Sequence, residues 1–367
     1  MSTPQFYPLR VTRLQPETDQ AVSVYFELPQ SDRTAFNYRA GQYLTLRFTI
    51  DGKEQRRAYS MCSAPHEDEL AVTVKQVKGG VVSNYIAGEL KVGDTVDVMP
   101  PMGRFLAEVN PAARRRYYLF GAGSGITPLM SILRSVLEEE PKSEVILFYG
   151  NRDEDNIIFK EQLDELERKY AGQLTVEHTL SQPKKYSTGG LKGLFKRSHT
   201  KWEGAKGRID RSALVEFLRR HPHGNLEARY YVCGPGQMID NVEAALLGHG
   251  IDEKHIHVER FVSANDNNGE GRARSVGGTV KVKLSRELVT VELEPGQTIL
   301  DGLLQAGHTP PYSCLAGACS TCMARVEKGG VKMDVCYALD DSEVEEGYVL
   351  TCQSHPTTPE VEIDYNV

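Results

Sequence analysis

The pattern of hydrophobic and polar positions changes twice along the chain. In the first 110 residues, short runs rich in β-branched and aromatic side chains alternate with turn dipeptides such as Asp51-Gly52 and Gly93-Asp94. Short strands separated by tight turns are typical of antiparallel sheets, so this region predicts an N-terminal antiparallel β-barrel over residues 1–110. The runs lie at 21–28, 43–48, 70–77 and 95–99.

Residues 111–262 show a different pattern, in which apolar strands alternate with helical stretches. Between the first two strands, Leu129, Ile132, Leu133, Val136 and Leu137 recur at helical spacing and mark one apolar face. Alternation of strand and helix predicts a central α/β domain built on a parallel sheet. Its expected strands lie at 117–120, 145–149, 174–180, 230–233 and 256–259.

The third part of the chain follows a stretch that cannot form a core. Residues 263–277 are dominated by Asn, Gly and charged side chains, so we expect a flexible linker there. After it, 280–284 and 289–293 flank a short polar turn and predict a hairpin, and 299–306 predicts a short helix. Residues 278–367 therefore predict a small C-terminal α+β domain.

Composition and charge restrict the compartment and the partners. The chain has no run of 18 apolar residues and no N-terminal signal peptide, and its seven cysteines are an odd number. We therefore expect a reducing, cytoplasmic location without a disulfide framework. The net charge is −7, and from Thr279 onward 14 acidic residues face six basic ones. This acidity argues against nucleic acid as a partner and fits either docking to a basic protein or simple solubility.

One basic segment interrupts the central domain. Residues 184–206 contain six lysines and Arg197, with Glu203 as their sole acid. Two interpretations stay open for this insertion. It is either a solvated basic loop or a contact for a cofactor phosphate or an acidic partner, including the chain's own C-terminal domain.

The cysteine spacing near the C-terminus carries the most specific chemistry. Cys314, Cys319 and Cys322 form C-x4-C-x2-C, and Cys352 follows 30 positions after Cys322. Three thiolates on one loop and a distant fourth are typical of a plant-type [2Fe–2S] cluster, whereas zinc sites usually combine two short cysteine pairs. We therefore predict these four cysteines as cluster ligands. Cys62 and Cys336 fall outside the pattern, and we expect them to be structural.

Two motifs in the barrel point to a pyrophosphate. Arg57-Ala58-Tyr59-Ser60 is expected at the start of a strand, where alternation separates Arg57 and Tyr59 from Ser60. About 20 residues later, Gly80-Val81-Val82-Ser83 opens a predicted short helix with Ser83 expected as a capping residue. A helix start offers free N–H groups to an anion, and Arg57 would add a charged contact.

Two glycine motifs mark the central domain as a nucleotide-binding domain. Gly121 to Pro128 reads G-A-G-S-G-I-T-P and joins a strand to a helix, with Pro128 expected at the first helical position. Cys233-Gly234-Pro235-Gly236 also ends a strand before a helix. Ligands of open parallel sheets bind where strands end, so both motifs predict a dinucleotide site. For Cys233 alone, a buried core thiol is the common alternative.

Together these motifs resemble the ferredoxin–NADP reductase superfamily, and the C-terminal domain resembles plant-type β-grasp ferredoxins. The domain order is similar to that of reductase components of multicomponent oxygenases. Within them, Pro311-Tyr312-Ser313-Cys314, 335–339 and 347–353 are most similar to phenylacetyl-CoA epoxidase reductases. Reductases of 3-ketosteroid 9α-hydroxylases have a similar layout. The resemblance implies FAD, a nicotinamide nucleotide and a [2Fe–2S] cluster as cofactors.

The resemblance also implies roles for individual residues. Tyr59, Ser60, Cys233 and Glu259 would take part in catalysis, with Tyr59 against the flavin ring, Ser60 near its N5 atom, and Glu259 handling a proton. The residues implied for binding FAD or the nucleotide are Arg57, Ala58, Tyr59, Ser60, Thr73, Lys75, Gly80, Val82, Ser83, Gly121, Gly123, Gly125, Thr127, Pro128, Arg152, Ser181, Gln182, Cys233, Gly234, Pro235 and Phe261.

The choice between NADPH and NADH depends on the residues after the second and third strands of the central domain. Arg152 could pair with a 2′-phosphate, and Ser181 and Gln182 could add hydrogen bonds. Asp153 and Glu154 favour NADH instead. We expect NADPH as the electron donor. The expected route runs from NADPH through FAD and the cluster to an oxygenase component, either the epoxidase or a Rieske-type oxygenase, and NADH-dependent reduction is the alternative.

Overall fold

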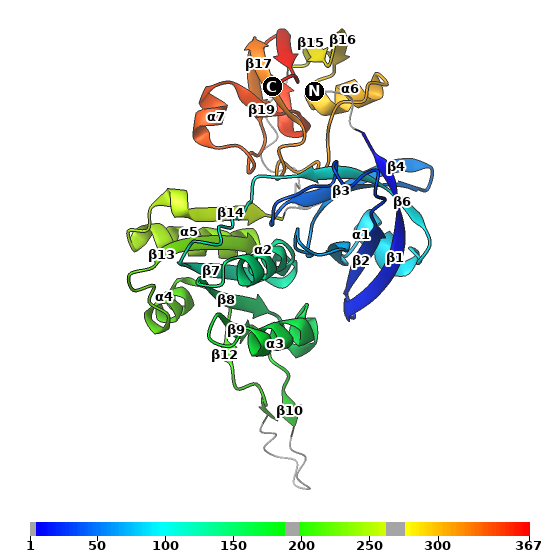
Figure 1. Ribbon diagram of the computed structural model, residues 1–367. Coiled ribbons are helices and arrows are strands. Elements are labelled where there is room, and N and C mark those ends of the chain that lie inside the picture. The colour runs from blue at the N-terminus through cyan, green and yellow to red at the C-terminus, as the bar shows by residue number, and fades with distance from the viewer. Residues whose placement is uncertain (1–4, 188–197, 262–275) are drawn as a thin grey trace.

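A computed structural model describes residues 5–187, 198–261 and 276–367 (Figure 1). The expected linker at 263–277 lies almost wholly outside the described residues, as does the middle of the basic insertion. The described chain forms three domains, stacked with the C-terminal domain above the other two in the view of Figure 1.

The N-terminal domain is a six-stranded antiparallel sheet that curls into a barrel. The strand order is β4-β3-β6-β1-β2-β5. An isolated bridge between Met61 and Val72 links the two edge strands, β4 and β5, and closes the barrel at that end. Its elements are β1 (Tyr7–Thr18), β2 (Ala21–Glu27), β3 (Tyr43–Ile50), β4 (Lys53–Ser60), β5 (Leu70–Lys75), α1 (Val81–Gly88) and β6 (Thr95–Met102).

Two details of the barrel differ from the expectation. Strand β1 lies outside the predicted runs, because most of its side chains face outward, and Leu9 and Val11 are its buried residues. Arg57 to Ser60 end β4 instead of starting a strand. Strand β4 begins with the polar residues Lys53 and Glu54, which hide its first half from a search for apolar runs.

The central domain is a parallel sheet with helices on both faces. Its order is β12-β9-β8-β7-β13-β14. The apolar strands β7 and β13 are buried on both faces, as parallel strands require. The elements are β7 (Arg115–Ala122), η1 (Gly123–Gly125), α2 (Ile126–Glu139), β8 (Glu144–Asn151), η2 (Glu154–Asn156), α3 (Lys160–Lys169), β9 (Leu174–Leu180), β10 (Tyr186–Ser187), β11 (Ser198–His199), β12 (Ala205–Lys206), α4 (Arg211–Arg220), β13 (Glu227–Gly234), α5 (Gly236–Gly248), η3 (Glu253–His255) and β14 (Ile256–Arg260).

The C-terminal domain has a five-stranded mixed sheet in the order β16-β15-β21-β17-β19. The predicted hairpin is β15–β16, in full antiparallel register, and β15 pairs in parallel with β21. The elements are β15 (Gly278–Leu284), β16 (Glu287–Leu293), α6 (Ile299–Gln305), β17 (Met323–Lys328), β18 (Val331–Met333), α7 (Asp341–Glu345), β19 (Tyr348–Leu350), η4 (Thr351–Gln353), β20 (Ser354–Pro356) and β21 (Glu360–Asp364).

The expected multidomain fold class is therefore confirmed, with a barrel-like antiparallel domain, a parallel α/β domain and a small α+β domain. None of the helices in the described ranges is both long and apolar enough to cross a membrane.

Candidate functional site

The glycine loop and the Cys-Gly-Pro motif meet at the point where the parallel sheet reverses its strand order. From β7 the chain adds β8 and β9 on one side, while β13 lies on the other. Gly125 packs directly on the end of β13, because a Cβ placed on it would lie 2.1 Å from the carbonyl oxygen of Cys233. The crevice at such a reversal is the usual ligand site of open α/β sheets. Both predicted nucleotide motifs therefore line one site.

Local hydrogen bonds hold the glycine loop in place. The Tyr149 hydroxyl, on β8, donates to the carbonyl oxygen of Gly123 at 2.8 Å, and the Thr127 hydroxyl donates to that of Ser124 at 2.8 Å. Pro128 is the third residue of α2, not the first as expected. Proline is still tolerated there, because the first-turn N–H groups of a helix have no partner within the helix.

Ser60, Cys233 and Glu259 come together from three separate segments. Ser60, at the end of β4, donates a hydrogen bond of 3.0 Å to the Glu259 carboxylate on β14. Glu259 is aligned with Cys233 on the neighbouring strand β13. The side chain of Cys233 is fully buried. A polar contact thus joins the barrel to the parallel sheet beside the Cys-Gly-Pro motif.

Burial sets the protonation of this group. It raises the pKa of Glu259 to about 8, although the hydrogen bond from Ser60 acts in the opposite direction. Glu259 as a whole residue is only partly buried, but its carboxyl group is enclosed by protein atoms. Burial, followed by the nearby Glu259 charge, also raises the pKa of Cys233 well above its usual value. At neutral pH the site therefore holds a neutral carboxyl group and a neutral thiol.

The other residues of the Arg57–Ser60 motif line the same end of β4. Tyr59 is partly buried against the barrel core, and burial raises its hydroxyl pKa. Arg57 donates from Nη1 to the carbonyl oxygen of Arg56, and Ala58 pairs with Thr45 across the strands. The motif therefore presents an aromatic ring, a cation and a hydroxyl close together, which suits a flavin and its phosphates.

The second anion motif differs from the prediction at its cap. The N-cap of α1 is Gly80, and Ser83 is the third helical residue. The Ser83 hydroxyl accepts a hydrogen bond of 3.2 Å from the N–H group of Val77. A Cβ on Gly80 would lie 2.6 Å from the Ser83 oxygen, so a larger residue here would displace the Ser83 hydroxyl from Val77. The helix start still offers N–H groups to an anion, but Ser83 does not cap them.

Two residues implied for cofactor binding lie in the barrel interior. Thr73 is buried, shares a hydrogen bond of 2.7 Å with Ser23, and donates one of 3.1 Å to the Cys62 sulfur. Val82 is buried within α1. Burial raises the pKa of the Cys62 thiol to about 11, in agreement with a structural role for this cysteine.

Lys75 of the barrel lies near both the glycine loop and Arg152. A Cβ on Gly123 would lie 3.7 Å from Lys75 Nζ, so this barrel lysine contacts the glycine loop. Burial lowers the Lys75 pKa, and the nearby charge of Arg152 lowers it further. Arg152 itself pairs with Asp153 at 2.9 Å. Two neighbouring cations of this kind form a suitable environment for a phosphate.

The expected ribose-side residues are joined through their backbones. The N–H group of Ser181 donates to the carbonyl oxygen of Asn151 at 3.0 Å, and that of Gln182 donates to the carbonyl oxygen of Arg152 at 2.7 Å. These bonds tie together the segments that follow β8 and β9. Phe261, which follows β14, has 38% of its surface exposed and is open to contact with a cofactor.

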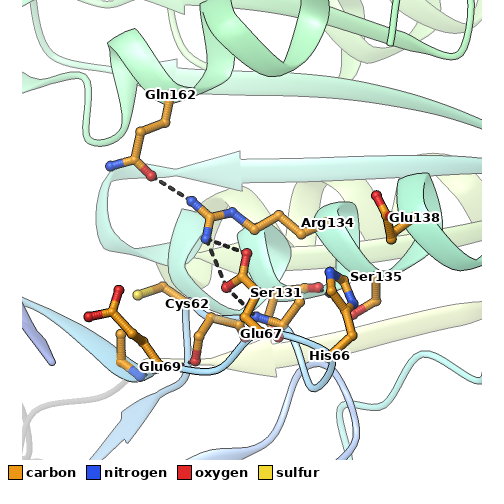
Figure 2. Close-up of polar contacts among 12 residues, drawn as sticks. Cys62, His66, Glu67, Glu69, Ser131, Arg134, Ser135, Glu138 and Gln162 are labelled. Carbon is orange, nitrogen blue, oxygen red and sulfur yellow. Dashed lines mark hydrogen bonds and ion pairs between the residues drawn. The ribbon is translucent and has the colours of Figure 1, made fainter. Parts of the chain in front are cut away.

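A polar cluster fixes the loop that follows Ser60 against the central domain (Figure 2). Arg134, on α2, donates to the Glu67 carboxylate at 3.0 Å and to Gln162 of α3 at 2.6 Å. Ser131, also on α2, donates to the Ser63 carbonyl oxygen at 2.6 Å. The helix that begins at the glycine loop therefore also sets the position of the loop that follows Ser60.

The four predicted ligand cysteines gather in the C-terminal domain. Cys314 contacts Cys319 and Cys352, and Cys352 contacts Cys322. The four sulfurs therefore lie close to one another in a connected group, as the four predicted thiolate ligands of one cluster must. In the described ranges, no three His, Cys, Asp or Glu side chains converge on one metal position. A cluster whose four cysteine ligands are shared between two irons does not require three ligands around one metal.

Backbone geometry in the ligand loop also fits a cluster. Leu315 and Gly317 have φ angles of 60° and 69°, and the Ala316 N–H group points at the Cys314 sulfur at 3.4 Å. N–H groups directed at ligand sulfurs are a common means of stabilising such clusters. Cys336 lies outside the four and packs against the small apolar cluster that contains Cys322 and Cys352, in agreement with a structural role.

The ligand loop is docked on the barrel next to Ser60. Tyr43 and Thr321 share a hydrogen bond of 2.8 Å, and the Thr45 hydroxyl donates to Ser313 at 2.8 Å. Cys319 lies close enough to Glu259 to act on its pKa. No pattern in the sequence indicates these contacts, because each joins single polar side chains from domains that are far apart in the chain.

Comparisons with known proteins agree with this arrangement. Three family models match: an oxidoreductase FAD-binding domain over residues 9–106, an oxidoreductase NAD-binding domain over 119–244, and a 2Fe-2S iron-sulfur cluster binding domain over 282–357. One model therefore falls within each of the three domains.

Full-length relatives are also found. The chain is 34% identical over 363 residues to a component of 1,2-phenylacetyl-CoA epoxidase from Escherichia coli (strain K12), covering 98% of both chains. It is 34% identical over 367 residues to the ferredoxin reductase component of 3-ketosteroid-9-alpha-monooxygenase from Rhodococcus rhodochrous, covering 97% of this chain and 96% of the relative. The solved structure of phthalate dioxygenase reductase shares the fold, with a TM-score of 0.60, 23% identity and 98% coverage of both chains.

Proposed function

The chain belongs to the family of oxidoreductases that join an FAD-binding, an NAD-binding and a 2Fe-2S domain and include reductase components of oxygenases, and on this premise we propose that it transfers electrons from NADPH to phenylacetyl-CoA epoxidase. The observation that carries the proposal is the docking of the Cys319 loop beside the Ser60–Glu259 pair. Flavin and cluster sites that share one contact region allow electrons to pass between them within the chain.

The cofactors supply the redox chemistry, in that FAD accepts a hydride and the [2Fe–2S] cluster carries single electrons. The protein binds and orients them. Arg57 and the start of α1 would hold the pyrophosphate of FAD, and Tyr59 would contact its ring. Glu259 keeps a proton on its carboxyl group below about pH 8 and exchanges it through the hydroxyl of Ser60. Cys233 and Gly125 shape the nicotinamide end of the crevice, and the four cysteines hold the cluster.

The preference for NADPH rests on Lys75 and Arg152. Their neighbouring charges favour the 2′-phosphate, which NADH lacks. Asp153 opposes this preference, since it already pairs with Arg152. The 2′-phosphate would have to replace Asp153 as the partner of the guanidinium group.

The epoxidase is proposed as partner because one of its components is similar to this chain over the whole length. The second candidate is a ketosteroid monooxygenase, whose reductase component is equally identical. The two candidates differ only in the oxygenase that accepts the electrons. A direct comparison of both oxygenases with this reductase therefore separates them.

Two measurements test the proposal in sequence. Anaerobic NADPH should bleach the visible absorbance of flavin and cluster in the purified protein, and NADH should do so more slowly. The reduced protein, mixed with the oxygenase subunits of phenylacetyl-CoA epoxidase, should then support epoxidation of phenylacetyl-CoA. Absence of bleaching with both nucleotides contradicts the reductase assignment. If the reduced protein supports turnover by the steroid oxygenase but not by the epoxidase, the epoxidase assignment is contradicted.

A further inference from the structure

One surface of the C-terminal domain lies directly over the cluster loop. It consists of Met323, Tyr337, Glu343 and Val344, and we call it the Tyr337 face. The N–H group of Tyr337 donates to the carbonyl oxygen of Gly317, within the ligand loop, at 3.0 Å. Met323 follows the ligand Cys322 in the chain. A protein bound on this face is therefore close to the cluster.

Two arginines from the other domains already contact the Tyr337 face. Arg104, which follows β6 of the barrel, forms an ion pair with Glu343 and approaches the Met323 sulfur at 3.7 Å. Arg260, at the end of β14, lies over the Tyr337 ring at 5.6 Å from its centroid. Helix α7, which contributes Glu343 and Val344 to this face, lies on the side of the C-terminal domain above β14 in Figure 1.

The composition of the face suits an arginine-rich protein surface. Residues 334–352 contain six acidic side chains and no lysine or arginine. Tyr337 and Val344 remain 46% and 41% exposed despite the two arginines. Exposed apolar groups between carboxylates are the complement of arginine side chains, whose guanidinium groups stack on rings and pair with carboxylates.

The two arginines differ in how firmly they are held. Arg260 is largely buried and has other partners, since it pairs with Asp240 at 2.6 Å. Arg104 has half of its side chain exposed, and Glu343 is its acidic partner in the described structure. The Glu343 side chain is 19% exposed, and an ion pair with one solvent-exposed partner is weak, typically on the order of 1 kcal/mol. Arg104 is therefore the contact that an incoming protein can replace.

We propose that the electron-accepting protein docks on the Tyr337 face through arginine side chains and that Arg104 competes with it for Glu343. This inference rests on the proposed function, because it assumes a protein acceptor outside the chain. While Arg104 is bound, the cluster faces the flavin barrel. When the acceptor replaces Arg104, one electron leaves the cluster and reduces one acceptor metal centre.

The test uses mammalian cytochrome c as a basic acceptor protein. The full-length protein is reduced with dithionite, excess reductant is removed, and the reduced protein is mixed with ferric cytochrome c at low salt. Each haem iron takes one electron from the protein. Because this assay needs neither NADPH nor an oxygenase, it remains interpretable even if the proposed electron donor or partner is wrong.

Two variants and two controls separate docking from general electrostatics. Arg104→Ala should raise the second-order rate constant for cytochrome c about threefold, because the competitor is removed. Glu343→Gln, which keeps the hydrogen-bonding shape of the α7 cap, should lower it about threefold. The matched controls are Glu287→Gln on the distant strand β16 and Arg39→Ala on the barrel, and both should behave like the original protein.

The decisive variant exchanges the two charges, as Arg104→Glu with Glu343→Arg. It should keep flavin-to-cluster transfer near the original rate, since the internal ion pair is preserved in reverse. Like Glu343→Gln, it should reduce cytochrome c more slowly than the original protein does. Integrity of the cluster is checked by its visible circular dichroism. Recovery of both rates in the exchanged protein would overturn the proposal, as would an unchanged or lower rate constant for Arg104→Ala.

Discussion

Ser60 and Glu259 lie 199 residues apart in the chain and share a hydrogen bond of 3.0 Å between the barrel and the parallel sheet. The bond holds a titratable carboxyl group beside Cys233, at the end of β13. Because the carboxyl group is buried, its pKa rises to about 8. We therefore expect flavin reduction to depend on pH within the physiological range.

The first prediction concerns the pH dependence of flavin reduction by NADPH. Below about pH 8 Glu259 is neutral and can donate a proton, whereas above it a negative charge forms beside the reduced flavin and disfavours it. The rate should therefore fall as the pH rises through about 8. Glu259→Gln should remove this fall, as measured by anaerobic stopped-flow absorbance between pH 6 and pH 9.5.

Ser60→Ala provides the control for this assignment. The hydrogen bond from Ser60 stabilises the Glu259 carboxylate and so lowers its pKa. Without that bond the pKa should rise, and the fall in rate should move to higher pH. A shift to lower pH would mean that another group is responsible.

The second prediction concerns the close packing of Gly125 on β13. A methyl group at this position would lie 2.1 Å from the backbone oxygen of Cys233, so α2 or β13 must move. Gly125→Ala should therefore lower the free energy of unfolding by about 1–3 kcal/mol in denaturant titrations. It should also weaken nucleotide binding. Gly88→Ala, at the end of α1 with open space around it, should cost no stability.

The third prediction separates the two redox steps. Cys319→Ser removes one ligand of the proposed cluster, so cytochrome c reduction should fall to the background rate. NADPH should still bleach the flavin, because Cys319 does not line the nucleotide crevice. The same substitution at Cys336, which lies outside the ligand set, should leave the iron content unchanged. Sustained cytochrome c reduction by the Cys319 variant would show that electrons bypass the cluster.

Much of this site could be predicted from local sequence. The cysteine spacing, the glycine loop and Cys233-Gly234-Pro235 each combine residue type, spacing and a strand end within a few positions. The prediction for the start of α1 was wrong because a different residue caps this helix. Ser83 looked like a helix cap, but the extended Gly80 takes that position and the serine hydroxyl turns back to Val77.

Contacts between domains could not be predicted in this way. The Ser60–Glu259, Tyr43–Thr321 and Arg104–Glu343 pairs each join single polar side chains from different domains. No periodicity or spacing marks such residues, because their positions depend on how whole domains pack. The cluster could therefore be predicted from sequence, whereas its docking surface could not.

The fourth prediction tests the choice of nucleotide at Arg152. If its guanidinium group binds the 2′-phosphate, Arg152→Ala should raise the KM for NADPH about tenfold and change that for NADH little. Lys75 lies near Arg152 but also contacts the glycine loop, so Lys75→Ala should weaken both nucleotides. Arg168→Ala, at the far end of α3, serves as the matched control and should change neither KM. Equal effects of Arg152→Ala on NADPH and NADH would remove the phosphate assignment and leave Asp153 as the residue that selects the ribose.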